Sequence, residues 1–187
     1  RGDLGFSITN GRPVTELLGE ALPDTLALTG LALVIGLVLA AVIAVLANYA
    51  PTTWLRSGFA ALPVLFASVP TFVVGVLALQ FLAFQLQVIP STDDGTFRAL
   101  IAPAATLGLL VSAPLSQVLG TAIGRTRQQP FVHVLYARGA GQRYAFGRGV
   151  LRNSSLPVLT LFGLAVGELL AGSVVTETVF ARDGLGQ

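Results

Sequence analysis

Four long apolar runs determine most of what this chain can fold into. They cover about residues 25–47, 59–84, 99–123 and 156–179. A bilayer core about 30 Å thick needs about 20 apolar residues in a helix, and each run reaches that length. Only 11% of the residues are charged, against about 25% in an ordinary soluble domain. The sequence therefore predicts an all-α fold, a polytopic membrane bundle with four transmembrane helices.

Prolines interrupt this pattern in two places. The second run contains Pro63 and Pro70, and we expect it to remain one kinked helix, because neighbouring helices can satisfy the carbonyls that a proline frees. Residues 14–22 predict a short helix on the membrane surface, and we expect Pro23 to end it.

The arginines predict the orientation in the membrane. All eleven basic residues are arginine, and short cytoplasmic loops carry the excess of positive charge. Six arginines and no acidic residue lie in 124–155, so we place this loop in the cytoplasm together with loop 50–58. Eight of the nine acidic residues then lie outside, in 1–24, 93–94 and 177–183, and Glu168 is the exception.

Composition excludes several kinds of chemistry. Without cysteine the chain has no disulfide, thiolate metal site or cysteine nucleophile. Without lysine it has no Walker A site, so it does not hydrolyse ATP itself. His133 is the only histidine and is interpreted as a loop residue, while Ser112 and Ser116 lack a histidine or lysine partner in their span. We predict no catalytic residue, no metal site and no cofactor. Nucleic-acid binding is disfavoured because the arginines cluster between apolar spans.

Small residues recur at every fourth position in three of the runs. Such ladders allow close backbone approach between membrane helices and predict a tightly packed bundle, or a seam that slides when the protein opens. The ladders are Ala32, Gly36, Ala40 and Ala44; Ala104, Gly108, Ser112, Ser116, Gly120 and Gly124; and Gly163, Gly167 and Ala171.

The 124–155 loop predicts a helical hairpin. Pro130 can start a helix, and Phe131, Val134 and Leu135 give it an apolar stripe at i, i+3 and i+4. Glycines at 139 and 141 let the chain reverse before a second helix over about 142–153. Such a hairpin suits docking to a cytoplasmic partner. The alternative is that its arginines only fix topology and contact lipid headgroups, at ~1 kcal/mol each.

Six short elements stand in order along the chain: R-G-D-L-G at 1–5, G-R-P-V at 11–14, L-P-D-T-L at 22–26, the stretch 137–158, E-T-V-F at 177–180 and G-L-G at 184–186. Together they resemble the permease subunit of bacterial ABC importers of the dipeptide, oligopeptide and nickel type, with 137–158 similar to the family's coupling loop. The resemblance covers nearly the whole chain. In the hairpin, the glutamate that names the family's EAA-type coupling loop is absent, and Leu135 and Tyr136 stand where small or basic residues are usual.

The resemblance implies a type I importer permease fold, in which residues 1–187 form a single transmembrane domain. Residues 1–24 are then an outer loop and 124–155 the cytoplasmic coupling loop, with one further helix expected at each end. The chain contains no methionine, and we expect the native chain to be longer. The residues expected to couple to ATPases are Phe131, Leu135, Tyr136, Ala137, Arg138, Gly139, Gly141, Arg143, Arg148 and Arg152.

Glu168 is the one acidic residue inside an apolar run. It lies 11 residues beyond Pro157, about 16 Å along a helix and near mid-membrane. A carboxylate there is costly unless it faces water or a partner, so we expect it to face a passage and to favour cationic groups. The alternative is a protonated or paired packing residue. Ser112 and Ser116 complete the predicted translocation path.

The predicted function is that of a multi-pass permease subunit of the bacterial inner membrane. Its implied partners are membrane lipid, a second homologous permease, two ATP-binding subunits and an extracytoplasmic substrate-binding protein. Peptides or a related small solute would cross, and the choice among dipeptides, oligopeptides, nickel complexes and sugars stays open. The alternatives are a secondary transporter, or a membrane anchor for a cytoplasmic protein that transports nothing.

Overall fold

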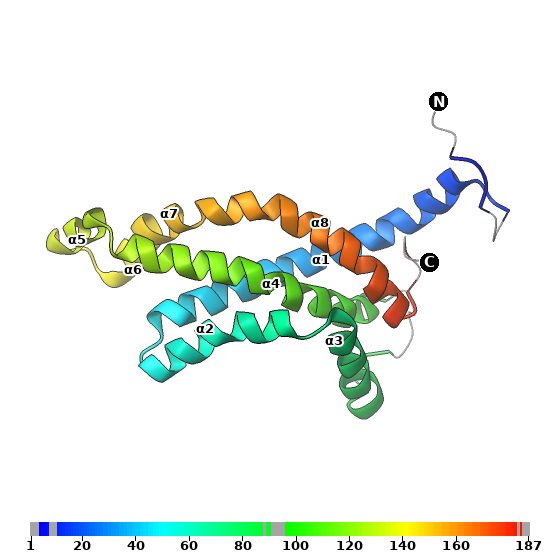
Figure 1. The fold of residues 1–187 in the computed structure, drawn as a ribbon, viewed down its shortest axis with the longest axis horizontal. Coiled ribbons are helices and arrows are strands. Elements are labelled where there is room, and N and C mark those ends of the chain that lie inside the picture. Colours follow the sequence, from blue (N-terminus) through cyan, green and yellow to red (C-terminus); the bar gives the residue numbers. More distant parts are fainter. Residues whose placement is uncertain (1–3, 8–10, 88, 91–95, 183, 185–187) are drawn as a thin grey trace.

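Three long helices run side by side along an elongated bundle (Figure 1). They are α1 (Val14–Tyr49), α4 (Phe97–Arg127) and α8 (Leu156–Val179). All three are long and apolar enough to cross a membrane. The computed structural model describes residues 4–7, 11–87, 89–90, 96–182 and 184. Over these residues the chain is almost entirely helical, which confirms the prediction of an all-α membrane bundle.

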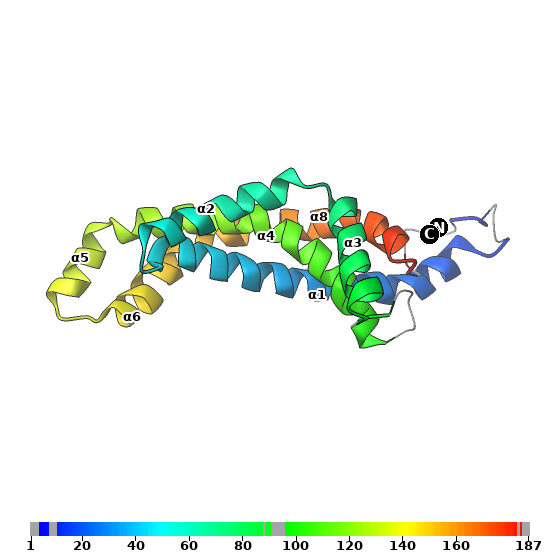
Figure 2. The same ribbon diagram turned by 90° about the horizontal axis from the view of Figure 1, so that it is seen from below.

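The second apolar run is not one kinked helix, contrary to the prediction. It forms α2 (Thr53–Ser68), then α3 (Thr71–Ala78) continued by the π-helical η1 (Leu79–Gln85), and the two parts are bent by 99°. Figure 2 shows α3 crossing the bundle while α2 lies along it. Val69 is extended, with φ −101° and ψ 125°, because a proline disfavours helical geometry in the residue before it. Pro70 thus divides the run, whereas Pro63 lies inside α2.

The first helix is longer than predicted, because Pro23 does not end it. α1 continues through this proline from Val14 to Tyr49. A proline inside a helix frees the carbonyl four residues earlier, here that of Gly19, which lies at an exposed position. Solvent can therefore satisfy that carbonyl, and the helix continues without a break.

Between α4 and α8 the chain forms a hairpin of short helices, at the end of the bundle opposite the start of α1 (Figures 1 and 2). Its elements are α5 (Pro130–Ala137), α6 (Gln142–Tyr144), the π-helical η2 (Ala145–Leu151) and α7 (Arg152–Ser154).

The core of the bundle is the contact between α1 and α4. A Cβ added at Gly108 would lie 2.9 Å from the Ala32 carbonyl oxygen and from Ile35 Cγ2, closer than side chains tolerate. Two of the predicted ladders therefore pack against each other. Around this contact lies one apolar cluster to which α8 also contributes: Leu28, Ala32, Ala40, Ala104, Leu107, Val111, Leu115, Ala165 and Leu169.

The third ladder does not pack within this chain. Gly163, Gly167 and Ala171 are exposed, and a Cβ at either glycine would have no neighbour within 4 Å. Most of α8 is likewise uncovered, since only 17% of its most apolar 18-residue segment is buried. The close approach expected of this ladder is absent from the described residues.

A buried carboxylate ties α8 to α1 at the end opposite the hairpin. Glu177 is 1% exposed and accepts a hydrogen bond of 2.7 Å from the Thr25 hydroxyl. Gly184 lies so close that a Cβ there would overlap the Glu177 carboxyl group. The chain after α8 thus folds back over this carboxylate.

Replacing Gly108 by alanine tests the α1–α4 contact. The added methyl group would meet backbone that cannot move aside easily, so we expect Gly108→Ala to lower the free energy of unfolding by about 1–3 kcal/mol. The measurement is thermal unfolding of the complete protein in detergent. Gly163→Ala is the matched control, and it should be neutral or stabilising by up to ~1 kcal/mol through helix propensity. Equal stability of the two variants would contradict the proposed packing.

Candidate functional site

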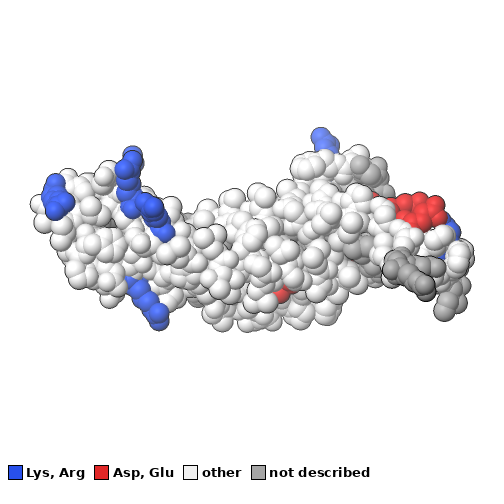
Figure 3. All heavy atoms as spheres, turned by 90° about the horizontal axis from the view of Figure 1, so that it is seen from above, with Lys and Arg blue, Asp and Glu red and all other residues white. Residues whose placement is uncertain are grey.

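Charge is separated along the length of the molecule. In Figure 3 basic atoms gather at the hairpin end, and acidic atoms gather near the opposite end, where a smaller basic group also lies. The central part is almost uncharged, as expected for a segment inside a bilayer. The hairpin is thus one candidate site, and the polar groups of the central part are a second.

The hairpin turns tightly at Gly139. This residue has φ +82°, which glycine adopts without the steric cost that a side chain adds. Two hydrogen bonds close the end of α5, from the Gly139 amide to the Tyr136 carbonyl at 2.9 Å and from the Ala140 amide to the Leu135 carbonyl at 3.0 Å. The chain then returns through α6, η2 and α7, so the predicted reversal has its physical cause at Gly139.

Apolar contacts attach the hairpin to the bundle. Val132 of α5 is 1% exposed and Val150 of η2 is fully buried. Both belong to a cluster with Ala44 of α1 and with Leu119 and Ile123 of α4. The hairpin is therefore packed onto the ends of the two helices that form the core.

The two arms of the hairpin also pack on each other. A Cβ at Gly149 would lie 3.0 Å from Leu135 Cδ1 and 3.5 Å from Phe131 Cε2. The predicted stripe of Phe131, Val134 and Leu135 therefore divides between two faces of α5. Val134 is 48% exposed, and the residue that anchors α5 in the core is Val132. The sequence reasoning did not single out Val132.

Polar and aromatic groups reinforce this attachment at the end of α1. Asn48 Nδ2 donates to the Gly120 carbonyl of α4 at 3.0 Å, and the Arg127 guanidinium donates to the Asn48 carbonyl. The same guanidinium lies 4.3 Å from the ring centroid of Tyr49. Tyr49 in turn meets Phe146 of η2 edge to face, with centroids 5.0 Å apart. Arg127 thus has a structural role that charge counting alone did not indicate.

Most of the residues predicted to couple lie on the free surface of this hairpin. Exposed positions are Phe131, Tyr136, Ala137, Arg138, Gly139, Gly141, Arg143, Arg148 and Arg152, and Leu135 is half-buried. Arg148 lies 6.0 Å from the ring centroid of Tyr144. Among the described residues, the guanidinium groups of Arg138, Arg143 and Arg152 make no hydrogen bond, ion pair or ring contact, so these three can meet a partner.

The predicted path residues separate into two groups. Glu168 is exposed and borders two small cavities on the α4 side of α8, one of about 210 Å³ and one of about 20 Å³. Ser112 is 0% exposed and donates to the Leu109 carbonyl at 2.6 Å. Because it is fully buried between helices, Ser112 has no surface that could touch a solute in this conformation. Ser116 is 2% exposed, yet borders a cavity of about 370 Å³ between α1, α2 and α4.

A second cavity lies beside α4 near the hairpin. Its volume is about 490 Å³, and Gln117, Thr121 and Arg125 of α4 line it together with Asn153 and Pro157. Gln117 and Thr121 also line the cavity of about 370 Å³ on the other side of α4. These polar residues were not singled out from the sequence as path residues. Their spacing of i, i+4 and i+8 in an apolar run was the available signal.

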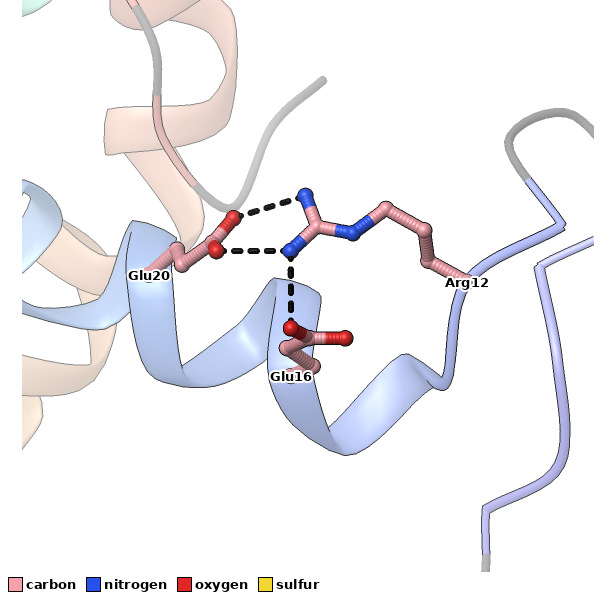
Figure 4. Close-up of polar contacts among 3 residues, drawn as sticks. All are labelled: Arg12, Glu16 and Glu20. Atoms are coloured by element: carbon pink, nitrogen blue, oxygen red, sulfur yellow. Dashed lines mark hydrogen bonds and ion pairs between the residues drawn. The ribbon is translucent and has the colours of Figure 1, made fainter.

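An exposed ion-pair cluster lies at the end of the molecule opposite the hairpin (Figure 4). The Arg12 guanidinium contacts both carboxylate oxygens of Glu20, at 3.0 Å and 2.6 Å, and Glu16 at 3.1 Å. Hydrogen bonds to these carboxylates raise the pKa of Arg12 above its usual value. The cluster ties the segment before α1 to the first turns of that helix. Among the described residues, no three His, Cys, Asp or Glu side chains gather as a metal site.

The chain resembles known transport proteins over most of its length. A family model described as binding-protein-dependent transport system inner membrane component matches residues 32–187. A dipeptide transport system permease of Lactococcus lactis is 32% identical over 99% of this chain and 61% of its own length. A putative peptide transport system permease of Brucella abortus is 30% identical, with shares of 99% and 62%. A glutathione transport system permease of Pectobacterium atrosepticum is 32% identical, with shares of 100% and 61%.

The fold also has a counterpart among solved structures. The crystal structure of an amino acid ABC transporter with histidines matches with a TM-score of 0.67 at 19% identity, over 92% of this chain and 75% of that chain. This match shows that the chain has the type I permease fold. The chain spans about three fifths of the length of the curated relatives described above.

Truncating Val132 tests how the hairpin is attached. Val132→Ala removes buried methyl groups from the cluster with Ala44 and Ile123, so we expect the hairpin to lose about 1–3 kcal/mol of local stability. Hydrogen exchange of the amides in 130–151 should become faster by the corresponding factor. Val134→Ala, on the exposed side of the same helix, is the control and should leave exchange unchanged. Unchanged exchange in both variants would show that the cluster does not hold the hairpin.

Proposed function

This chain belongs to the family of binding-protein-dependent transport system inner membrane components, and we propose that it forms part of the membrane passage of an ATP-driven importer of peptides. The hairpin α5–α7 is the surface on which a cytoplasmic ATPase subunit docks. The observation that carries this proposal is the combination of an exposed, arginine-bearing hairpin surface with a buried attachment to α1 and α4. The chain itself is a multi-pass membrane protein and a transport subunit.

The attachment explains how docking would move the membrane helices. When two ATPase subunits close on ATP, a displacement of α5 reaches Val132 and Val150 directly, and both pack on Ala44 and Ile123. Packed interiors deform little, so the displacement moves the ends of α1 and α4 together. The hydrogen bond from Asn48 to Gly120 keeps these two ends in register.

The remaining partners follow from the same proposal. A second homologous permease would cover the exposed apolar face of α8, which is costly to leave in contact with water but suits another helix or lipid. A substrate-binding protein would deliver the solute at the end that carries Glu16 and Glu20. Peptides are the favoured cargo because the names of the three relatives refer to dipeptide, peptide and glutathione transport.

The two alternatives left by the sequence have less support. A secondary transporter couples to ions through several intramembrane charges, and the described part of the apolar spans shows one exposed carboxylate, Glu168. A passive anchor has no need for a polar face along α4. ATP-dependent uptake into membrane vesicles separates the importer from both.

Charge reversal on the hairpin tests the docking surface. We expect Arg138→Glu combined with Tyr136→Ala to abolish co-purification of the ATPase subunits and to reduce ATP-driven peptide uptake at least ~10-fold, because interface centres depend on arginine and aromatic side chains. Helix content and melting temperature should not change, since both side chains are exposed. Arg98→Glu, exposed at the far end of α4, is the matched control. Normal uptake by the double variant would contradict docking at this surface.

A further inference from the structure

The two faces of α4 differ in chemistry. One face carries Gly108, Ser112 and Gly120 and packs against α1. Another carries Gln117, Thr121 and Arg125, three exposed residues at i, i+4 and i+8, which we call the polar stripe. These three side chains make no hydrogen bond or ion pair with the other residues that the structure describes. An apolar helix thus presents one polar face that this chain leaves uncovered.

The exposed face of α1 provides a direct comparison. Val34, Val38 and Val42 have the same spacing and are 57%, 57% and 49% exposed. These valines suit lipid. In hydrocarbon, the uncovered amide of Gln117 would lose its hydrogen bonds to water, which costs several kcal/mol, while Arg125 continues the same face at the hairpin end of the helix. The polar stripe therefore faces water or a polar partner, whereas the α1 stripe can face lipid.

The polar stripe continues toward Glu168. The small cavity beside Glu168 is lined by Pro114 and Leu115 of α4, and the cavity of about 490 Å³ begins at Gln117, less than one turn further along. The α8 side of this groove runs from Glu168 past Leu161 to Pro157. Glu168 thus stands at the mid-membrane end of the groove between α4 and α8, and Arg125 at the hairpin end.

We propose that the groove between α4 and α8 is this chain's wall of the passage, with Glu168 receiving the cationic group and Arg125 the carboxylate of a zwitterionic solute. This inference rests on the importer function proposed above and adds the wall residues and the charge preference at each end. Gln117 and Thr121 supply hydrogen-bonding groups between the two charges. Glu168 lies beside Pro114 of α4, so about 11 residues of that helix, or ~16 Å along its axis, separate it from Arg125. A short peptide would therefore meet the two charges in succession.

Thiol reactivity tests whether the groove holds water. This chain contains no cysteine, so Gln117→Cys, Thr121→Cys and Val42→Cys each introduce one thiol, and labelling is followed by mass on this chain alone within the assembled complex. Val42 lies near the depth of Gln117, because Ala44 packs beside Gly120. A thiolate attacks the sulfenyl sulfur of a charged methanethiosulfonate, forming a mixed disulfide and releasing methanesulfinate, and thiolates form in water and not in hydrocarbon. We expect the cysteines at the two stripe positions to react at least ~10-fold faster than the cysteine of Val42→Cys. A transported peptide should lower the labelling rate at both stripe positions.

The charge preference is read from the same labels. At Gln117→Cys, replacing Glu168 by glutamine should lower the rate ratio of the cationic ethylammonium to the anionic ethylsulfonate reagent about fivefold. At Thr121→Cys, Arg125→Gln should raise that ratio by a similar factor, and Arg98→Gln should leave it unchanged. Slow labelling at both stripe positions would place the groove against lipid or a partner helix and overturn the proposal. Ratios unaffected by Glu168 and Arg125 would overturn the charge assignment.

ATP-driven peptide uptake by the wild-type complex distinguishes failure of the groove proposal from failure of the importer function. If the complex takes up peptide on ATP while the stripe thiols stay unreactive, the passage exists and runs elsewhere. If it takes up nothing, the function proposed above is wrong.

Discussion

Close contact between α1 and α4 is the interaction on which the rest of the structure depends. Lipid supplies little hydrophobic drive between helices, so their association relies on van der Waals contact that only small residues permit. Gly108 against Ala32 provides that contact in the central part of the bundle, and Asn48 against Gly120 continues it to the hairpin end. Because Val132 and Val150 pack onto the same two helix ends, the position of the hairpin is fixed by this contact as well.

The same contact decides which side of α4 is free for transport. Small residues at i+4 spacing commit one face to α1, and this buries Ser112. The polar stripe lies on the face that remains, beside α8 and its carboxylate. A push delivered to the hairpin therefore acts on the helix that also carries the stripe. One helix joins the docking surface to the groove, without any need for a loop to transmit the motion.

Much of this was predictable from residue patterns. Three of the four apolar runs correctly predicted the long helices α1, α4 and α8, the loop 124–155 predicted the helical hairpin, and its glycines predicted the turn. Other features depend on geometry that no single pattern contains. Whether Pro70 divides a span while Pro23 does not depends on whether the preceding residue leaves helical geometry, as Val69 does. Glu168, Ser112 and Ser116 were predicted as path residues, and of the two serines Ser112 is fully buried between helices while Ser116 borders a cavity. The spacing of Gln117, Thr121 and Arg125 places them on one face of α4, but only the position of α1 shows that this face is left uncovered.

We propose that the hairpin is a cytoplasmic surface that an ATPase subunit holds. The test places a cysteine at Ala137, an exposed hairpin position, in this sequence without cysteine, and treats intact cells with an impermeant maleimide. We expect no labelling from outside, labelling after the cytoplasmic face is opened, and protection of that cysteine when the ATPase subunits are bound. Labelling in intact cells, or labelling that bound ATPase subunits do not slow, would contradict it.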